Sequence, residues 1–195
     1  NPLYRALKKD YDCYSIPLND IDNAACYTQK ALDELSPEII ISIECPGLSE
    51  KNCYSNIRGE DISDNCATFD YFMKLASCPT IAIGDGGNEI GMGNIYDAIG
   101  QLNIIPCTTK CDELLIADVS NWGAYGLIAL LSIFHNQNLL ADVNPKTTLM
   151  YLSDLGSLDG LTRKNALTED GLCFSCGEDI ISQLERICGL ISSNL

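Results

Sequence analysis

Three short apolar runs constrain the fold of this 195-residue chain more than any other feature of its sequence. They are EIIISIE at 38–44, PTIAIGD at 79–85 and ELLIADV at 113–119. Short continuous runs of β-branched and aliphatic residues are typical of strands that are buried on both faces of a parallel sheet. Because segments with helical periodicity separate the runs, the sequence predicts an α/β fold, a layered α/β/α domain around a mostly parallel β-sheet.

Apolar residues recur with helical spacing between and after these runs. The apolar stretch WGAYGLIALLSIF at 122–134 is shorter than the roughly 20 residues of a membrane-spanning helix, so it predicts a buried helix instead. The length of the chain suits a single α/β domain over residues 1–195. The predicted helices are 20–35, 64–77, 94–102, 120–134, 144–156 and 178–191.

The chain is strongly acidic, with a formal net charge of −15. Such a surface repels nucleic acid and anionic membranes, so neither is an expected partner. The twelve basic residues are also absent from 75–109 and from 111–145. A ligand bound near those segments would meet few cations, which argues against a multiply charged phosphate ligand unless a metal ion accompanies it.

The eleven cysteines are an odd number, and several of them lie in apolar strand-like or helical context. A chain of this length needs no disulfide staples, so the sequence favours free thiols in a reducing compartment. The spacing CFSC at 173–176 is the one that resembles a redox or zinc motif. Zinc would need two further ligands, such as Cys107 and Cys111, and a redox role would need a strand-to-helix junction. The surrounding residues indicate a loop, so neither role is favoured for Cys173 and Cys176.

The second apolar run leads into a glycine-rich stretch, IAIGDGGNEIGMGN at 81–94, which holds two carboxylates and no lysine or arginine. It lacks the Gly-Lys-Ser/Thr ending of a phosphate-binding P-loop and the Gly-x-Gly-x-x-Gly spacing of a dinucleotide fingerprint. Glycines permit positive φ and close approach of a ligand to the backbone, while Asp85 and Glu89 supply groups that exchange protons. One alternative stays open, in which the stretch is a tight turn and Asp85 caps a helix.

Polar residues follow each of the three predicted strands. Glu44 ends the first, Asp85 ends the second, and the stretch 118–121 follows the third. Because ligands of open α/β sheets bind outside the carboxyl ends of the strands, these residues predict a ligand site at one edge of the sheet. Ser120 or Asn121 is also a natural helix N-cap, and helix amides behind such a cap bind a carboxylate without any cation.

Several stretches of the chain resemble the D-glutamate cyclase family, which is found in bacteria and in a mitochondrial protein of animals. The resemblance implies that D-glutamate closes to the lactam 5-oxo-D-proline with loss of water, the reaction of a carbon–oxygen lyase of the hydro-lyase type. It also implies the cytoplasm for a bacterial protein and the mitochondrial matrix for a eukaryotic one. The stretches that carry it are IAIGDGGNEIGMGN, DELLIADVSNWGAYGL, ISIECPG with YSNIRGEDIS, and GSLDGLT with LTEDGL, within about 38–187.

The chain departs from the family pattern at two places. Family members carry a basic residue after the glutamate of the first strand, where this chain has Cys45. They also carry an upstream Glu-Thr-Asp-Gly-Pro motif that these 195 residues do not contain, so we expect an upstream segment of the family to be missing here.

Lactam formation needs a base for the substrate ammonium, an acid for the departing oxygen, and donors for the oxyanion. Asp85 and Glu89 are expected to divide the first two roles, because neighbouring carboxylates push their proton affinities apart, with Asn88 as a third catalytic residue. The amides of Gly86 and Gly87 are expected to be oxyanion donors. Arg58 is expected to bind the substrate carboxylate through a two-pronged contact. The full set of polar side chains expected to bind the substrate is Arg58, Asn88, Ser120, Asn121 and Glu44.

Two other functions stay open. In one, the chain is a metal-dependent hydrolase or phosphate-handling enzyme whose carboxylates bind Mg²⁺ or Mn²⁺, since such hard ions suit oxygen ligands. In the other, the chain is a domain that binds a small amino acid without turnover. Cyclisation itself requires no cofactor, although a divalent cation (Mn or Mg) is compatible with the sequence, and so is a homodimer. The metal-ligand candidates are Asp85, Glu89, Asp118 and Glu44.

Overall fold

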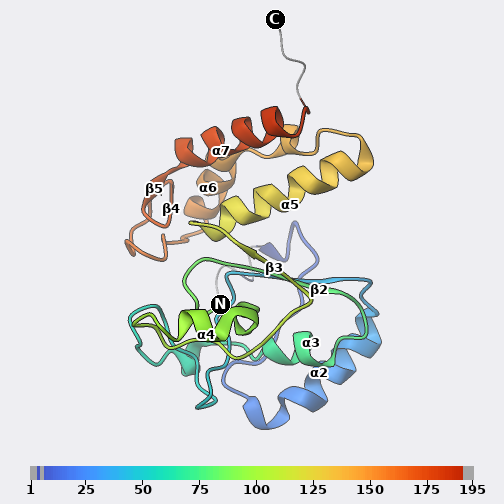
Figure 1. Ribbon diagram of the computed structural model, residues 1–195, viewed down its shortest axis with the longest axis vertical. Helices are drawn as coiled ribbons and strands as arrows, with labels where there is room; N and C mark the ends of the chain where they lie inside the picture. The colour runs from blue at the N-terminus through green and yellow to red at the C-terminus, as the bar shows by residue number, and fades with distance from the viewer. Residues whose placement is uncertain (1–3, 5–6, 191–195) are drawn as a thin grey trace, which may run out of the picture. The chain divides into compact units, whose positions relative to one another are not determined.

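The computed structural model describes Tyr4 and residues 7–190 of the chain (Figure 1). Contacts between residues divide the chain into two compact units. We call the unit formed by Ser15–Ser120 the sheet unit, and the unit formed by Asn1–Tyr14 with Asn121–Leu195 the helical unit. The single domain predicted from chain length stays a prediction.

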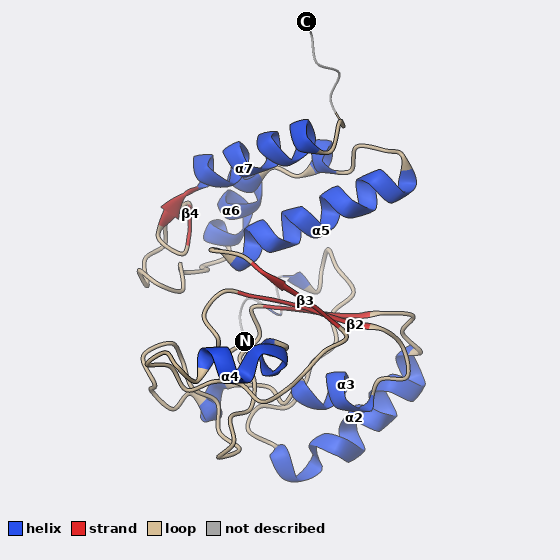
Figure 2. Cartoon of the chain, viewed as in Figure 1, coloured by secondary structure: helices blue, strands red, loops and turns tan. Residues whose placement is uncertain are grey.

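A three-stranded parallel sheet is the centre of the sheet unit (Figure 2). Its strands are β1 (Ile40–Ile43), β2 (Thr80–Gly84) and β3 (Glu113–Ile116), in the order β1-β2-β3. Ile43 pairs with Ile83, and Gly84 pairs with Ile116, so all three strands end at the same edge of the sheet. The predicted α/β layered fold and its parallel sheet are confirmed.

Two helices of the sheet unit pack on one face of this sheet, α2 (Ile21–Leu35) and α3 (Asp70–Leu75). Figure 1 shows both of them on the same side of the strands. Burial on both faces is wrong for β1, where Ile41 and Ile43 are exposed, and for β3, where Ile116 is exposed, because the helices of this unit cover a single face. The buried core between helices and sheet is formed by Ala31, Ile40, Phe72, Met73, Ala82 and Ile90.

Two predicted helices are shorter than their apolar patterns indicate. In place of one helix over 64–77, the structure has a 3₁₀ turn at Ser63–Asn65 and then α3. The chain is extended at Cys66, and Ala67 bridges to Leu18, so this pairing interrupts the helix. In place of 94–102, a 3₁₀ turn at 92–95 leads into the single-turn helix α4 (Tyr96–Ile99).

The helical unit contains α5 (Ser120–His135, whose first residue belongs to the sheet unit), α6 (Pro145–Asp154) and α7 (Phe174–Ile187). A 3₁₀ turn at 140–142 follows α5. The side chains buried at the centre of this unit are Tyr125, Ala129, Leu140 and Ile181. The helices predicted at 120–134 and 144–156 are therefore confirmed, but the burial predicted for 122–134 is wrong for its second half, where Leu130, Ile133 and Phe134 are exposed. In the described part of the chain no helix has the length and apolar character to cross a membrane.

The last helix begins four residues earlier than its predicted start, because a short antiparallel hairpin leads directly into it. The hairpin pairs β4 (Thr168–Glu169) with β5 (Leu172–Cys173) across a turn at Asp170 and Gly171, which both have positive φ. Cys173 ends β5, and the next residue begins α7. The loop expected around CFSC is therefore wrong, and the motif lies at a strand-to-helix junction. The helix ends at Ile187, before the predicted end at residue 191, and Gly189 beyond it has a positive φ. Residue 191 itself lies outside the described residues.

Candidate active site

Asp85 is the first residue after β2, and it is half-buried. Its Oδ2 accepts hydrogen bonds from the Ser120 amide at 2.9 Å and from the Ser120 hydroxyl at 2.7 Å. Ser120 is fully buried and is the first residue of α5, where a carboxylate is favoured by the helix dipole. Asp85 therefore caps a helix, as considered above, but this helix is α5, which lies far along the chain, and not one that comes directly after the loop.

Glu89 is the most deeply buried carboxylate of the glycine-rich loop, with 5% of its surface exposed. It accepts a hydrogen bond from the Gly87 amide at 2.7 Å, and both of its oxygens accept from the Gly86 amide at 3.2 Å. Burial raises the pKa of the Glu89 carboxyl, the amide hydrogen bonds oppose this effect in part, and the nearby charge of Asp85 adds to it. Glu89 is therefore the side chain of this loop that binds a proton more readily than an exposed glutamate does.

The two amides predicted as oxyanion donors, those of Gly86 and Gly87, are the ones that donate to Glu89. The backbone geometry needs glycine at these positions. Gly87 has a φ of +97°, and a Cβ on Gly86 would lie 2.7 Å from Oε1 of Glu89. The glycines thus let the backbone wrap closely around a buried carboxylate.

Asn88 fastens the loop to the segment that follows β1. Its side-chain amide is buried and donates to the Ser55 carbonyl at 2.9 Å, and its backbone carbonyl accepts from the Gly47 amide at 2.8 Å. Glu89 also forms a bridge with Pro46. Asn88 therefore holds the loop in place, and its predicted catalytic and binding roles stay predictions.

Arg58 is exposed and lies in a turn organised by Asn56, whose side-chain oxygen accepts from the Arg58 amide at 3.0 Å. The neighbouring Ile57 brings this turn close to the loop, because a Cβ on Gly86 would be 3.5 Å from Cδ1 of Ile57. The turn that carries Arg58 thus reaches the glycine-rich loop, as a carboxylate-binding residue would need.

The other residues predicted at the sheet edge have different surroundings. Glu44 is exposed, has a φ of +52°, and donates its amide to the Ile83 carbonyl at 2.9 Å, which places its backbone beside the end of β2. Asp118 is exposed between β3 and α5, and the preceding Ala117 donates to the Gly84 carbonyl at 3.3 Å. The strand register therefore brings Glu44, Asp85 and Asp118 to one sheet edge, as predicted.

Asn121 belongs to a network in the helical unit that the sequence analysis missed. Its side-chain amide donates to Glu169 at 3.2 Å, and Glu169 also accepts from the Trp122 indole at 3.1 Å and the Tyr125 hydroxyl at 2.5 Å. Glu169 is 5% exposed. The burial of Tyr125 and, to a smaller extent, its hydrogen bond to Glu169 raise the pKa of the Tyr125 hydroxyl. A signal was present, because Glu169 lies within the stretch LTEDGL.

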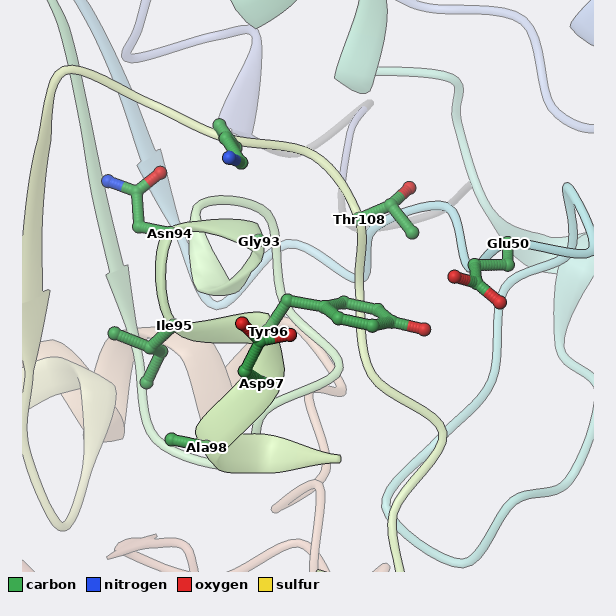
Figure 3. A pocket seen from close by; sticks show the side chains of 9 residues that line it. Glu50, Gly93, Asn94, Ile95, Tyr96, Asp97, Ala98 and Thr108 are labelled. Carbon is green, nitrogen blue, oxygen red and sulfur yellow. The ribbon is translucent and has the colours of Figure 1, made fainter. Parts of the chain in front are cut away.

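A cavity of about 480 Å³ lies at the far end of the glycine-rich loop (Figure 3). The Tyr96 ring points toward Glu50, and the hydrogen bond between them raises the pKa of the Tyr96 hydroxyl. Asn94, also in the wall, is held by the Cys111 backbone through bonds of 2.9 and 3.1 Å. The other charged side chains of the wall are Asp97 and Lys110.

Two comparisons with known proteins show what this chain is similar to. The family model described as "D-glutamate cyclase-like, C-terminal" matches residues 5–185. The human protein named "D-glutamate cyclase, mitochondrial" is 31% identical over 140 residues, which is 64% of this chain. The matched part is 23% of the human protein, so the chain corresponds to about a quarter of that relative's length. The chain belongs to the D-glutamate cyclase-like, C-terminal family.

Proposed function

We propose that the chain is a lyase domain that closes D-glutamate to 5-oxo-D-proline with loss of water. The observation that carries this proposal is the pair Asp85 and Glu89 on one glycine-rich loop at the carboxyl edge of β2. One carboxyl is buried with a raised pKa, and the other accepts two hydrogen bonds from the start of a helix. Family membership and the name of the human relative support the same reaction.

The reaction moves two protons from the substrate nitrogen to the oxygen that leaves as water. Asp85 takes the first proton from the ammonium group, which frees the lone pair that attacks the carboxyl carbon of the γ-carboxylate. Both hydrogen bonds to Asp85 fall on Oδ2, so Oδ1 has no hydrogen-bond partner among the described residues and is the oxygen we assign to this step. A positioned base of this kind contributes roughly 10²–10⁴-fold to the rate.

After the nitrogen has attacked, Glu89 in its protonated form donates its proton to one oxygen of the γ-carboxylate. This oxygen leaves as water after it also receives the second proton of the nitrogen. Transfer of the proton held by Asp85 to Glu89 restores both groups for the next turnover. While Glu89 is neutral it accepts hydrogen bonds more weakly, so the amides of Gly86 and Gly87 become available to the developing oxyanion. Two such donors supply roughly 10²–10³-fold each.

The substrate supplies its own proximity, because nucleophile and carboxyl belong to one molecule. The domain therefore needs only to hold the folded conformer and to move protons. Arg58 is the residue that we assign to the α-carboxylate, since its turn reaches the loop through Ile57. Ser120 would act through Asp85 by fixing the orientation of its carboxylate.

The test is incubation of the full chain with D-glutamate or L-glutamate, followed by mass spectrometry for the loss of one water. Asp85→Asn and Glu89→Gln should each lower the rate of lactam formation by about 10²-fold or more. Glu113→Gln is the matched control, because this exposed carboxylate lies at the opposite end of β3, and its rate should equal that of the parent.

Each alternative function predicts a separate result in this experiment. Folded Asp85→Asn and Glu89→Gln variants with full activity would overturn the proposal. Activity that EDTA removes and Mn²⁺ restores would favour the metal-dependent class, in which carboxylates hold the ion. Binding of D-glutamate or its lactam without any mass change would favour a domain that binds a small amino acid and does not convert it.

A further inference from the structure

Cys173 and Cys176 lie on either side of the first turn of α7. Cys173 is the N-cap residue, with φ −62° and ψ 145°, and Cys176 is the third residue of this 14-residue helix. At a helix start the N-cap side chain faces the backbone of the third helical residue, whose own side chain can turn back toward the N-cap, so this spacing allows the two thiols to meet. Cys173 is exposed and Cys176 is half-buried, which makes the first thiol accessible and the second one protected.

The surroundings of Cys173 favour a thiolate. Hydrogen bonds from the Ser175 hydroxyl and amide lower the pKa of the Cys173 thiol, although the Glu178 carboxylate opposes this effect. The Lys146 ammonium lies over the ring of Phe174, 5.4 Å from the ring centroid, so a cation lies beside the residue that follows Cys173. Thiolates at helix N-termini, near cations and in Cys-X-X-Cys motifs are the reactive ones in proteins.

The buried cysteines of the chain differ in this respect. Burial raises the pKa of the Cys66 thiol to about 11 and that of Cys107 to about 12, with the nearby Asp70 contributing in both cases. These thiols stay protonated near neutral pH and are shielded from solvent. Cys173 is therefore the thiol that a small disulfide would react with, and the thiols of the core are not.

A fixed hairpin presents the cysteine pair. The Asp159 carboxylate accepts from the Gly171 amide at 2.8 Å and from the Thr168 hydroxyl at 2.7 Å, which holds β4 and the turn of the β4–β5 hairpin in place. The Phe174 amide donates to the Leu167 carbonyl at 3.2 Å. The strand that delivers Cys173 is thus anchored on both sides of its turn, and Figure 2 shows how it runs into α7.

We propose that Cys173 and Cys176 are a thiol–disulfide exchange site that accepts small disulfides of the glutathione type. The Cys173 thiolate attacks one sulfur of the small disulfide, forms a mixed disulfide and releases one thiolate. Cys176 then loses its proton and attacks the Cys173 sulfur, which forms the Cys173–Cys176 bond and releases the second thiolate. The protein dithiol gives up two electrons and two protons, and the small disulfide becomes two thiols.

Peptide mapping of the full chain tests this proposal. Trypsin cleaves after Lys164 and Arg186, and the peptide 165–186 contains Cys173 and Cys176 but no other cysteine. After the reduced protein is treated with oxidised glutathione at pH 7 and quenched with acid, this peptide should lose two hydrogen masses. In Cys176→Ser the second step is blocked, so the peptide should instead gain one glutathione. In Cys173→Ser it should do neither.

Two controls separate this chemistry from general thiol oxidation. Cys188→Ser changes a half-buried cysteine just beyond the other end of α7, and the Cys173–Cys176 disulfide should form in it as in the parent. Cys26 is exposed in the interior of α2, so it should take up glutathione more slowly than Cys173 does in Cys176→Ser. An unchanged peptide in the parent protein, or uptake at Cys176 in a folded Cys173→Ser variant, would overturn the proposal.

Discussion

Removal of the Asp70 carboxylate tests how the sheet unit holds its glycine-rich loop. Asp70 is fully buried at the start of α3, and its oxygens accept from the Leu48 amide at 2.9 Å, the Tyr54 hydroxyl at 2.8 Å and the Thr109 hydroxyl at 2.5 Å. The residue before Leu48 donates to the Asn88 carbonyl, and the Thr109 carbonyl accepts from amides of the glycine-rich loop. One carboxylate therefore supports the loop from both of its sides.

The magnitude follows from the three donors that Asp70→Ala would leave behind. The Leu48 amide cannot turn to another acceptor, and a buried unpaired amide costs about 1–3 kcal/mol. The Tyr54 and Thr109 hydroxyls rotate, so each loses about 1 kcal/mol. We expect the free energy of unfolding to fall by about 3–5 kcal/mol, which for a chain of this size corresponds to about 6–20 °C in Tm. Asp70→Asn keeps an acceptor for Leu48 and should lose about 1–3 kcal/mol.

Urea unfolding followed by far-UV circular dichroism measures the global effect, and hydrogen exchange of the Leu48 amide measures the local one. Asp112→Ala is the matched control, because this carboxylate also accepts two hydrogen bonds, both from Thr80, but is exposed to solvent, so its removal should change the free energy of unfolding less than Asp70→Ala does. Equal effects of Asp70→Ala and Asp112→Ala, with the Leu48 amide still protected, would refute the reasoning.

Three further perturbations have expected outcomes. Gly177→Ala would place a Cβ 2.6 Å from Oε2 of the buried Glu169, so it should lower the free energy of unfolding by about 1–3 kcal/mol in urea titrations, whereas Gly126→Ala, with open space at its Cβ, should not. Burial acts to raise the pKa of the Asp159 carboxyl, but hydrogen bonds from Thr162, Thr168 and Gly171 outweigh it and lower this pKa to about 2. Because the folded pKa lies below the unfolded one, the stability from Asp159 is present above about pH 4 and is lost as the pH falls through about 2, and Asp159→Asn should flatten this acid limb of a stability-against-pH curve. Gly87→Ala would strain a φ of +97° and meet Ile99 at 2.9 Å, so lactam formation should fall while Gly160→Ala, which meets nothing, keeps the parent rate.

The strands, the parallel order and the polar sheet edge were predictable, because each depends on short-range patterns. β-branched runs such as 80–84 specify strands, and parallel strands end at a common edge whatever else the fold contains. The glycine-rich loop could be recognised as a candidate site for the same reason, since its glycines and carboxylates are contiguous in the sequence. The hydrogen-bond donors of Asp85 could not be predicted, because Ser120 lies far along the chain.

Buried carboxylates were the part that the sequence did not disclose. An isolated acidic residue is exposed in most proteins, so Asp70 and Glu169 had no local feature that marked them as buried. Their donors come from distant segments, and only tertiary structure brings these together. The junction at Cys173 was missed for a related reason, because a two-residue strand such as β5 is too short to leave a periodic pattern.

The hydrogen-bond partners of Asp85 and Glu89 are peptide amides and one serine hydroxyl, and this has a consequence for the turnover cycle. Neutral dipoles stabilise the negative charge of the loop without cancelling it. A lysine or arginine in their place would cancel it. In the proposed reaction the incoming amino acid carries a positive nitrogen, whereas the nitrogen of the lactam is uncharged. The chemical step itself would therefore end the electrostatic attraction, so the loop would hold the reactant more strongly than the product and would be ready for the next molecule.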